Sequence, residues 1–482
     1  MTAQPLWTVA AMAQAMGAEH SGTLPAGVDG ISIDSRSIGA GDAFFAVKGD
    51  SRDGHEFVAA ALKAGAGLAV VATDWHGSDI GDAPLLRVPD VLEGLRALAR
   101  AARARLDAKV IGVTGSVGKT GTKEALRLAL GASGATHASV ASYNNHWGVP
   151  LSLARCPANA HYAVFEMGMN HAGEIEPLSK LVRPHVAIIT TVEPVHLEFF
   201  GSVEAIADAK AEIFHGLEGG GAAVINRDNP HFERLAAAAR NAGARIVSFG
   251  EHAKADARLV KLALQPDSST VEARILGADV AYKLGAPGKH QVLNSLAVLA
   301  AVSLAGADLA LAALALAAVQ PAPGRGARSV LTLGVSGQAL LIDESYNANP
   351  ASMRAAIALL GQAEIGPQGR RIAVLGDMLE LGAAGADLHR GLVDSIPAHG
   401  IDLVFCCGPL MHALWEALPS ERRGGYAESA GALEADVIAA IRPGDAVMVK
   451  GSLGSRMGPI VKALERQYSR RDAPVATARA QG

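Results

Sequence analysis

The chain is poor in cysteine and in aromatic residues, and each scarcity excludes a class of protein. Its three cysteines, Cys156, Cys406 and Cys407, are too few for a disulfide framework, so a reducing cytosol is the expected setting. Aromatic residues make up only 4% of the sequence, which argues against surfaces that stack on bases. The formal net charge of -4 likewise gives no reason to expect a nucleic-acid partner. We therefore expect a cytoplasmic protein that binds no nucleic acid.

Segments that would cross a membrane are also lacking, with one candidate. Residues 1–7 have neither a basic start nor a long apolar core, so a secretory signal peptide is not expected. Residues 295–319 form an almost continuous run of Ala, Leu and Val, but Gly306 and Asp308 interrupt it. Two buried helices that break near Gly306 explain this run better than a membrane span does. The protein is therefore expected to be soluble.

The length of 482 residues exceeds what one ordinary core can organise, so several domains are expected. We predict an α/β protein of three domains. Residues 1–107 would form a small α/β domain, and residues 108–320 a central domain with a mostly parallel sheet. Residues 321–482 would form a second α/β sheet that is similar to a dinucleotide-binding fold. The Pro- and Gly-rich segment at residues 320–326 marks the last boundary.

The pattern of apolar runs predicts how these domains are built. In the central domain, strand-like runs alternate with helical segments, which predicts a parallel sheet with helices on both faces. Residues 256–284 alternate short strands and are expected to form an antiparallel edge. Residues 331–342 are typical of a hairpin around Ser336 and Gly337.

The clearest functional motif lies at residues 109–130. An apolar, β-branched run is followed by glycines and then by a segment with helical periodicity. A strand, a glycine turn and a helix N-terminus together form a phosphate cradle, or P-loop. Lys119 would reach the β- and γ-phosphates and the Thr120 hydroxyl would bind Mg²⁺. Position 113 is Val where the general pattern has its first Gly, and the alternative is a plain turn with a solvated lysine. The proposed nucleotide-binding residues are Thr114, Gly115, Ser116, Val117, Gly118, Lys119 and Thr120.

Three further polar residues follow strands of the central domain or lie on its helices. Glu166 ends a predicted strand, where a carboxylate beside a phosphate cradle can bind Mg²⁺, although it can also be a helix cap or a surface ion pair. His196 follows the next strand and can bind a second cation or orient a phosphate, but a single loop histidine is often incidental. Lys210 by itself is typical of an exposed helical lysine that pairs with a neighbouring acid.

Polar loops also follow strands in the other two domains. In the third domain they comprise residues 343–350, 376–382 and 450–452, at strand ends where α/β sheets bind ligands. Together they suggest a cleft that a domain motion closes. In the first domain, residues 34–36 and 48–55 could hold an anionic ligand, although they are also compatible with plain polar turns.

Together these motifs resemble the Mur ligases, which are ATP-dependent amide-forming enzymes of bacterial peptidoglycan synthesis. The resemblance extends from about Gly30 to Met457. The motifs that carry it are Asp34-Ser35-Arg36, Asp53-Gly54-His55, the P-loop, Asn144 to Pro150, Glu166-Met167-Gly168, Ala209 to Ile213, Ser345 to Pro350, Gly376-Asp377-Met378, Glu380-Leu381-Gly382 and Lys450-Gly451-Ser452.

The resemblance implies roles that spacing alone does not give. It implies ATP, two Mg²⁺ ions and CO₂, the last as a carbamate on Lys210 that bridges the metal ions. Lys119, Lys210 and His196 would be catalytic, and the metal ligands would be Thr120, Glu166, His196 and Lys210. For the nucleotide, Asn294 would contact adenine, Arg325 the phosphates and Glu344 the ribose. Relatives often have an aspartate where this chain has Glu344. The residues implied in substrate binding are Ser35 and Arg36 for the UDP group, Asn145, and Asn347 and Lys450 on the amino-acid side.

The implied reaction joins UDP-MurNAc-tripeptide and D-alanyl-D-alanine through an acyl phosphate, in a protein expected to be a monomer. The alternatives are a related ligase that adds diaminopimelate or lysine, or a folylpolyglutamate synthase. A regulatory P-loop GTPase would need a guanine-reading Asn-Lys-x-Asp loop, which does not follow the P-loop here. Whether the third residue of the acceptor peptide is diaminopimelate or lysine stays open.

Overall fold

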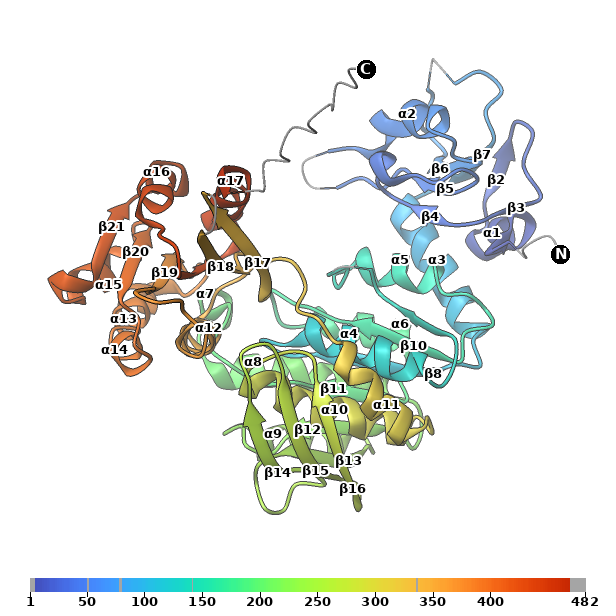
Figure 1. Ribbon diagram of the computed structural model, residues 1–482. Coiled ribbons are helices and arrows are strands. Elements are labelled where there is room, and N and C mark those ends of the chain that lie inside the picture. The colour runs from blue at the N-terminus through green and yellow to red at the C-terminus, as the bar shows by residue number, and fades with distance from the viewer. Residues whose placement is uncertain (1–4, 50–51, 78–79, 141, 335–336, 469–482) are drawn as a thin grey trace, which may run out of the picture.

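Within the described residues, three sheets of five or more strands follow one another along the chain, and each organises one domain (Figure 1). The computed structural model describes residues 5–49, 52–77, 80–140, 142–334 and 337–468. The chain passes from the first sheet to the second between Val88 and Lys109, and from the second to the third between Leu284 and Ala327. The three-domain α/β architecture predicted from the sequence is confirmed, whereas the boundaries at residues 107 and 320 stay predictions.

The N-terminal domain has a five-stranded sheet in the order β2-β7-β6-β5-β4, parallel except for β2. A two-stranded ribbon of β1 and β3 lies beside it. The sequence analysis did not predict α1, although its buried Val9, Met12 and Met16 have helical spacing. The elements are β1 (Trp7–Thr8), α1 (Val9–Met16), β2 (Glu19–Ser21), β3 (Gly27–Val28), β4 (Ile31–Ser32), β5 (Ala43–Phe45), α2 (Val58–Lys63), β6 (Leu68–Ala72), β7 (Leu85–Val88) and α3 (Val91–Ala104).

The central domain has a nine-stranded sheet in the order β16-β15-β14-β13-β12-β11-β8-β10-β9. All neighbours from β9 to β14 are parallel, which confirms the predicted parallel core. Its strands are β8 (Lys109–Thr114), β9 (Thr136–Ala138), β10 (Tyr162–Glu166), β11 (Val186–Ile189), β12 (Ala222–Asn226), β13 (Arg245–Gly250), β14 (Ala257–Leu264), β15 (Ser269–Ile275) and β16 (Ala278–Leu284).

Helices cover both faces of this sheet, as the alternating pattern predicts. One apolar core contains side chains of α4, α10 and α11, and the opposite core contains side chains of α5, α6, α8 and α9. Leu126 of α4 and Phe165 of β10 are fully buried in these two cores. The helices are α4 (Lys119–Gly131), α5 (Gly148–Ala154), α6 (Ile175–Val182), α7 (Leu197–Phe200), α8 (Val203–Ala211), α9 (Phe232–Asn241), α10 (Lys289–Leu304) and α11 (Leu309–Ala315).

Two finer predictions for the central domain are also confirmed. Strands β14, β15 and β16 form the antiparallel edge expected for residues 256–284. The apolar run at residues 295–319 divides into α10 and α11, which are separated at Gly306. Across the described ranges, no helix combines the length and the apolar character needed to span a membrane.

The C-terminal domain has a six-stranded sheet in the order β17-β18-β22-β19-β20-β21, in which only β17 is antiparallel. β17 and β18 form the predicted hairpin, and Ser336 of its turn lies outside the described residues. The elements are β17 (Ala327–Leu333), β18 (Gly337–Glu344), α12 (Pro350–Gly361), β19 (Arg371–Gly376), α13 (Gly385–Arg390), α14 (Ser395–Ala398), β20 (Leu403–Cys407), α15 (His412–Ala417), β21 (Arg423–Ala427), α16 (Ala430–Ala440), β22 (Ala446–Lys450) and α17 (Gly458–Tyr468).

Helix α3 joins the N-terminal domain firmly to the central one. The Arg103 guanidinium, only 5% exposed, donates to the carbonyl oxygens of Val182 (2.7 Å) and Arg183 (2.8 Å) and to Glu218 (3.2 Å). These carbonyls lie at the end of α6, where helical carbonyl groups lack partners within the helix. The guanidinium therefore caps α6 and fixes α3 against it.

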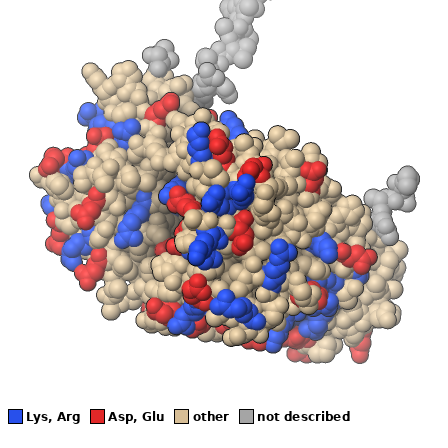
Figure 2. Space-filling model, turned by 90° about the horizontal axis from the view of Figure 1, so that it is seen from below, with Lys and Arg blue, Asp and Glu red and all other residues tan. Residues whose placement is uncertain are grey.

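On the face of the molecule shown in Figure 2, the described basic side chains do not form a continuous stripe. On the face in Figure 2, Lys and Arg side chains of the described residues are interspersed with Asp and Glu. A nucleic-acid-binding face typically gathers basic residues into one patch.

Candidate active site

The predicted phosphate cradle forms between β8, which ends at Thr114, and α4, which begins at Lys119. Gly115 and Gly118 have φ angles of +144° and +87°, which residues with side chains rarely adopt. A Cβ atom on Gly118 would also lie 2.5 Å from Asn294 Nδ2. The turn therefore needs glycine at these positions. It opens at the N-terminus of α4, where unpaired N–H groups favour an anion.

Lys119 folds back over this turn. Its Nζ donates a hydrogen bond of 2.7 Å to the carbonyl oxygen of Gly115. Burial lowers the pKa of Lys119, an effect that Glu166 opposes and Arg325 reinforces. The ammonium group is thus held above the cradle, where an incoming phosphate would meet it.

Glu166 is a fully buried carboxylate at the end of β10. Its Oε2 accepts a hydrogen bond of 2.9 Å from Thr120 Oγ1, and its Oε1 accepts one of 2.7 Å from Asn144 Nδ2. Among the described residues it has no ion-pair partner. A buried carboxylate without a direct ion pair, next to a hydroxyl oxygen, fits the hard oxygen ligands that Mg²⁺ prefers.

Asn144 is a site residue that the sequence analysis missed. The motif Asn144-Asn145 has two adjacent amides, of which Asn145 was predicted as the site residue. Sequence alone could not separate them, because neighbouring residues in a loop point in different directions. The described residues also contain no cluster of three or more His, Cys, Asp and Glu side chains that could hold a metal ion. A cation at Glu166 would therefore need further oxygen ligands, such as Thr120 and substrate phosphates.

Lys210 is buried, although the sequence around it predicts an exposed lysine. The interpretation as an exposed lysine paired with an acid is wrong, because Lys210 on α8 is 2% exposed. Within the described part of the chain its ammonium has no hydrogen-bonding or ionic partner. Burial lowers its pKa well below 10.5, and the like charge of Lys119 lowers it further. A larger fraction of Lys210 is therefore a neutral amine than for a solvated lysine.

His196 lies between the central and C-terminal domains. It precedes α7 with a φ of +55°, and its Nδ1 lies 2.5 Å from Glu380 Oε2 of the C-terminal domain. Glu380 also has a positive φ, of +63°, and its carbonyl oxygen accepts the N–H of Glu198 at 3.3 Å. Burial lowers the pKa of His196, although the Glu380 carboxylate opposes this. Two residues with unusual backbone conformations thus meet across the domain interface.

The C-terminal domain contributes Glu344 and Lys450 to the same site. Lys450 is 2% exposed, and its Nζ contacts Glu344 Oε2 at 3.2 Å and the carbonyl oxygen of Asn347 at 2.9 Å. The neighbouring Asp343 instead accepts hydrogen bonds from the Gly324 N–H (2.8 Å) and from the Ser345 hydroxyl (2.6 Å). Of these two neighbouring acids, Glu344 therefore lines the cleft and Asp343 does not.

The linker residue Arg325 joins the two halves of the cleft. Its guanidinium lies over the ring of Tyr346 at 4.3 Å and approaches Ser142 Oγ at 3.4 Å. Tyr346 belongs to the C-terminal domain and Ser142 to a loop of the central domain. Tyr346 was not predicted as a site residue, because a stacking partner from another domain leaves no spacing pattern.

A cleft of about 520 Å³ gathers most of the predicted residues. It lies at the carboxyl ends of β8 and β10, where parallel sheets bind ligands. The C-terminal domain contributes the loops that follow β18 and β22, two strands that are neighbours in its sheet. The predicted residues that line the cleft are Ser116, Val117, Gly118, Lys119, Thr120, Glu166, His196, Asn294, Arg325, Glu344, Asn347 and Lys450.

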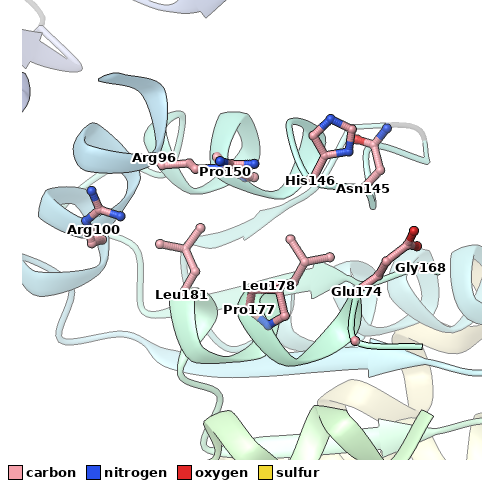
Figure 3. Close-up of a pocket in the computed structure, with 11 residues that line it drawn as sticks. Arg96, Arg100, Asn145, His146, Pro150, Gly168, Glu174, Pro177, Leu178 and Leu181 are labelled. Atoms are coloured by element: carbon pink, nitrogen blue, oxygen red, sulfur yellow. The ribbon is translucent and has the colours of Figure 1, made fainter. Parts of the chain in front are cut away.

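Other predicted residues lie outside this cleft. Asn145 lines a separate cavity, shown in Figure 3. Ser35 and Arg36 lie on the N-terminal domain, where Arg36 is exposed and pairs with Asp34 at 2.7 Å. Lys210 is buried next to the cleft without lining it. The structure thus assembles the predicted nucleotide residues but does not bring the predicted UDP residues to them.

Comparisons with known proteins agree with this arrangement. Family models match three consecutive parts of the chain: "Mur ligase family, catalytic domain" at residues 27–103, "Mur ligase middle domain" at residues 113–302, and "Mur ligase, glutamate ligase domain" at residues 331–453. The chain belongs to the Mur ligase family.

Individual relatives extend over nearly the whole chain. The UDP-N-acetylmuramoyl-tripeptide–D-alanyl-D-alanine ligase of Bacillus subtilis (strain 168) is 34% identical, and the match covers 91% of this chain and 93% of that protein. A solved UDP-N-acetylmuramoylalanyl-D-glutamyl-2,6-diaminopimelate–D-alanyl-D-alanyl ligase from Acinetobacter baumannii has a TM-score of 0.80 at 30% identity, covering 97% of this chain and 100% of that one. The MurF ligase of Thermotoga maritima, solved in complex with ADP, has a TM-score of 0.74 at 27% identity, covering 92% and 98%.

Proposed function

We propose that this chain joins D-alanyl-D-alanine to UDP-MurNAc-tripeptide at the expense of ATP, in the cytoplasmic synthesis of peptidoglycan precursors. The observation that carries this proposal is the cleft itself. It sets a phosphate cradle and the buried Glu166 of one domain against Glu344, Asn347 and Lys450 of another. The ligase names of relatives that match over nine-tenths of the chain support the same reaction.

The chemistry proceeds in two steps. A carboxylate oxygen of the tripeptide attacks the γ-phosphorus of ATP, and the bond to the ADP oxygen breaks to leave an acyl phosphate. The amine of D-alanyl-D-alanine then attacks the acyl carbon, phosphate leaves, and the amine loses a proton. Because both reactants of the first step are anions, charge neutralisation and positioning dominate catalysis. Lys119, held over the cradle by Gly115, supplies one positive charge at the transferred phosphoryl group.

Mg²⁺ would supply the remaining charge neutralisation when bound. Glu166 and Thr120 would hold one ion, and His196 and Lys210 would serve a second. Asn144 would keep the Glu166 carboxylate in place through its hydrogen bond. The donor set of carboxylate and hydroxyl oxygens supports the first ion.

Lys210 would serve its ion as a carbamate. An unprotonated amine nitrogen attacks the carbon of CO₂, a proton is released, and a neutral side chain becomes an anion. The lowered pKa of Lys210 supports this step, because burial and Lys119 disfavour the ammonium form. A carbamate would also give Lys119 an anionic neighbour in place of a like charge.

The remaining residues would bind the substrates. Asn294, beside Gly118, would contact adenine, Arg325 the phosphates and Glu344 the ribose. Ser35, Arg36 and Asn145 would hold the UDP-MurNAc-peptide, with Asn347 and Lys450 on the D-alanyl-D-alanine side. Residues 1–107 would thus bind the UDP substrate, residues 108–320 ATP, and residues 321–482 the incoming dipeptide. The protein would act as a monomer.

Phosphate release in the presence of UDP-MurNAc-tripeptide and ATP tests this function. D-alanyl-D-alanine is expected to stimulate the release, and the ligated pentapeptide product is expected in equal amount. Stimulation by glutamate, lysine or diaminopimelate instead would assign the chain to a different ligase. Binding of GTP in preference to ATP would contradict the proposal altogether.

A further inference from the structure

A second cavity, of about 510 Å³, lies between helices α3 and α6. It meets the nucleotide cleft at Gly168, whose backbone lines both. The adjacent loop has the same double role, because Asn144 bonds to Glu166 in the cleft while Asn145 lines the cavity. A molecule that reacts beside Glu166 can therefore extend a side branch into this cavity.

One end of the cavity is basic. Arg96 and Arg100 are four residues apart on α3, so they share one face of the helix, and Figure 3 shows both beside the cavity. Arg96 pairs with Glu93. Arg100 is exposed and makes no ion pair or hydrogen bond within the described ranges. At least one guanidinium is therefore available to a carboxylate, which it can bind through two parallel hydrogen bonds.

The other end is acidic, and the middle is apolar. Glu174 lies near Gly168, at the opposite end from Arg100 in Figure 3. Its carboxylate accepts the Asn170 N–H at 2.7 Å. Leu178 and Leu181 of α6 line the stretch between the two ends. An aliphatic arm fits this stretch, with an ammonium favoured near Glu174 and a carboxylate favoured near the arginines.

We propose that this cavity is a subsite for the side chain of the acceptor peptide's third residue, and that Arg96 and Arg100 bind a carboxylate at its end. This inference rests on the proposed function, in which the main-chain carboxylate of that residue reacts beside Glu166. Gly168 is two residues from Glu166, so the side chain of the reacting residue enters the cavity where the two sites meet.

The subsite distinguishes the two candidates for the third residue. The side chain of diaminopimelate ends in both a carboxylate and an ammonium, whereas that of lysine ends in an ammonium alone. Glu174 attracts the ammonium that both carry and so does not discriminate. The arginines bind the carboxylate that only diaminopimelate carries. Diaminopimelate is therefore the preferred third residue, in line with the name of the Acinetobacter baumannii relative.

The test compares two UDP-MurNAc-tripeptides, one with meso-diaminopimelate and one with L-lysine, in phosphate release stimulated by D-alanyl-D-alanine. The unaltered enzyme is expected to show a KM at least about tenfold lower for the diaminopimelate peptide, which is the usual effect of one charged hydrogen bond. Equal KM values, or a lower one for the lysine peptide, would overturn the subsite. No stimulated release with either peptide would instead refute the proposed function.

Substitutions then assign the preference to the arginines. Arg100→Gln combined with Arg96→Gln is expected to raise the KM for the diaminopimelate peptide about tenfold and to leave that for the lysine peptide within about twofold. Arg100→Glu is expected to lower the KM for the lysine peptide, a gain that loss of folding cannot produce. Lys180→Gln is the matched control, because Lys180 is an exposed cation on α6 outside the cavity lining. Equal effects on both peptides, or none, would overturn the assignment.

Discussion

Replacing Lys210 by methionine tests the most unusual charge in the site. Methionine is as long as the aliphatic stem of lysine, so it keeps the buried apolar contacts but removes the amine. If Lys210 carries an anionic carbamate beside the transferred phosphoryl group, the variant loses one preorganised electrostatic contact. Such a loss costs about 10²–10³-fold in kcat, or about 2.7–4 kcal/mol. The rate of phosphate release at saturating substrates measures it.

The same substitution is expected to act on stability in the opposite direction. The unfolded chain keeps Lys210 protonated up to about its ordinary pKa of 10.5, whereas burial makes the folded chain release that proton at a lower pH. Between these two pKa values the unfolded chain binds more protons, so the free energy of unfolding rises with pH. In CO₂-free buffer Lys210→Met is therefore expected to be more stable than the parent at neutral pH. The difference should shrink as the pH approaches 10.5.

Two controls separate these effects from general damage. Lys180→Met removes an exposed lysine of α6 and is expected to change neither kcat nor the thermal midpoint appreciably. Lys210→Ala leaves room for a small anion, and added short carboxylic acids or chloride are expected to restore part of its activity. Full activity of Lys210→Met would refute the carbamate. A stability below that of the parent at neutral pH would refute the desolvated ammonium.

Three further outcomes are expected. Lys119→Ala should lower kcat at least about 10²-fold while the circular dichroism spectrum stays unchanged, and retained activity would remove Lys119 from the mechanism. Gly118→Ala should lower the free energy of unfolding by about 1–2 kcal/mol, because Gly118 has a φ of +87°. Gly131→Ala is the control and should cause no such loss, because a Cβ atom there meets open space. Equal losses of stability in the two variants would contradict a role for the backbone conformation of Gly118. Glu380→Gln should lower kcat because His196 loses its charged partner, and the same change at Glu416, which pairs with His412 on the surface, should leave kcat unaltered.

Much of the central domain could be predicted because its information is local. The β-branched run that forms β8, the glycines and the helix formers of α4 agree on one structure within about twenty residues. The break of the apolar run at Gly306 is equally local, since Gly306 has a φ of +73° between two helices. Where neighbouring residues alone decide the backbone, the sequence pattern suffices.

The parts that could not be predicted depend on distant segments. Lys210 looks like a surface lysine in its own helix, and only packing of other elements around α8 makes it buried. Asn144 and Glu166 are separated by 22 residues, and Glu380 is separated from His196 by 184. No spacing rule connects such pairs, because the sheet order and the domain arrangement bring them together.

The clamp that Arg103 forms has a mechanical consequence. Because the Arg103 guanidinium donates to the last carbonyl groups of α6, the N-terminal domain cannot tilt against the central domain without leaving buried polar groups unpaired. At the junction with the C-terminal domain the described contacts are less buried: Arg325 reaches Ser142 at 3.4 Å, and the pair of His196 and Glu380 is partly exposed. We therefore expect the N-terminal domain to keep its position against the central domain during turnover, while the C-terminal domain is freer to change its orientation.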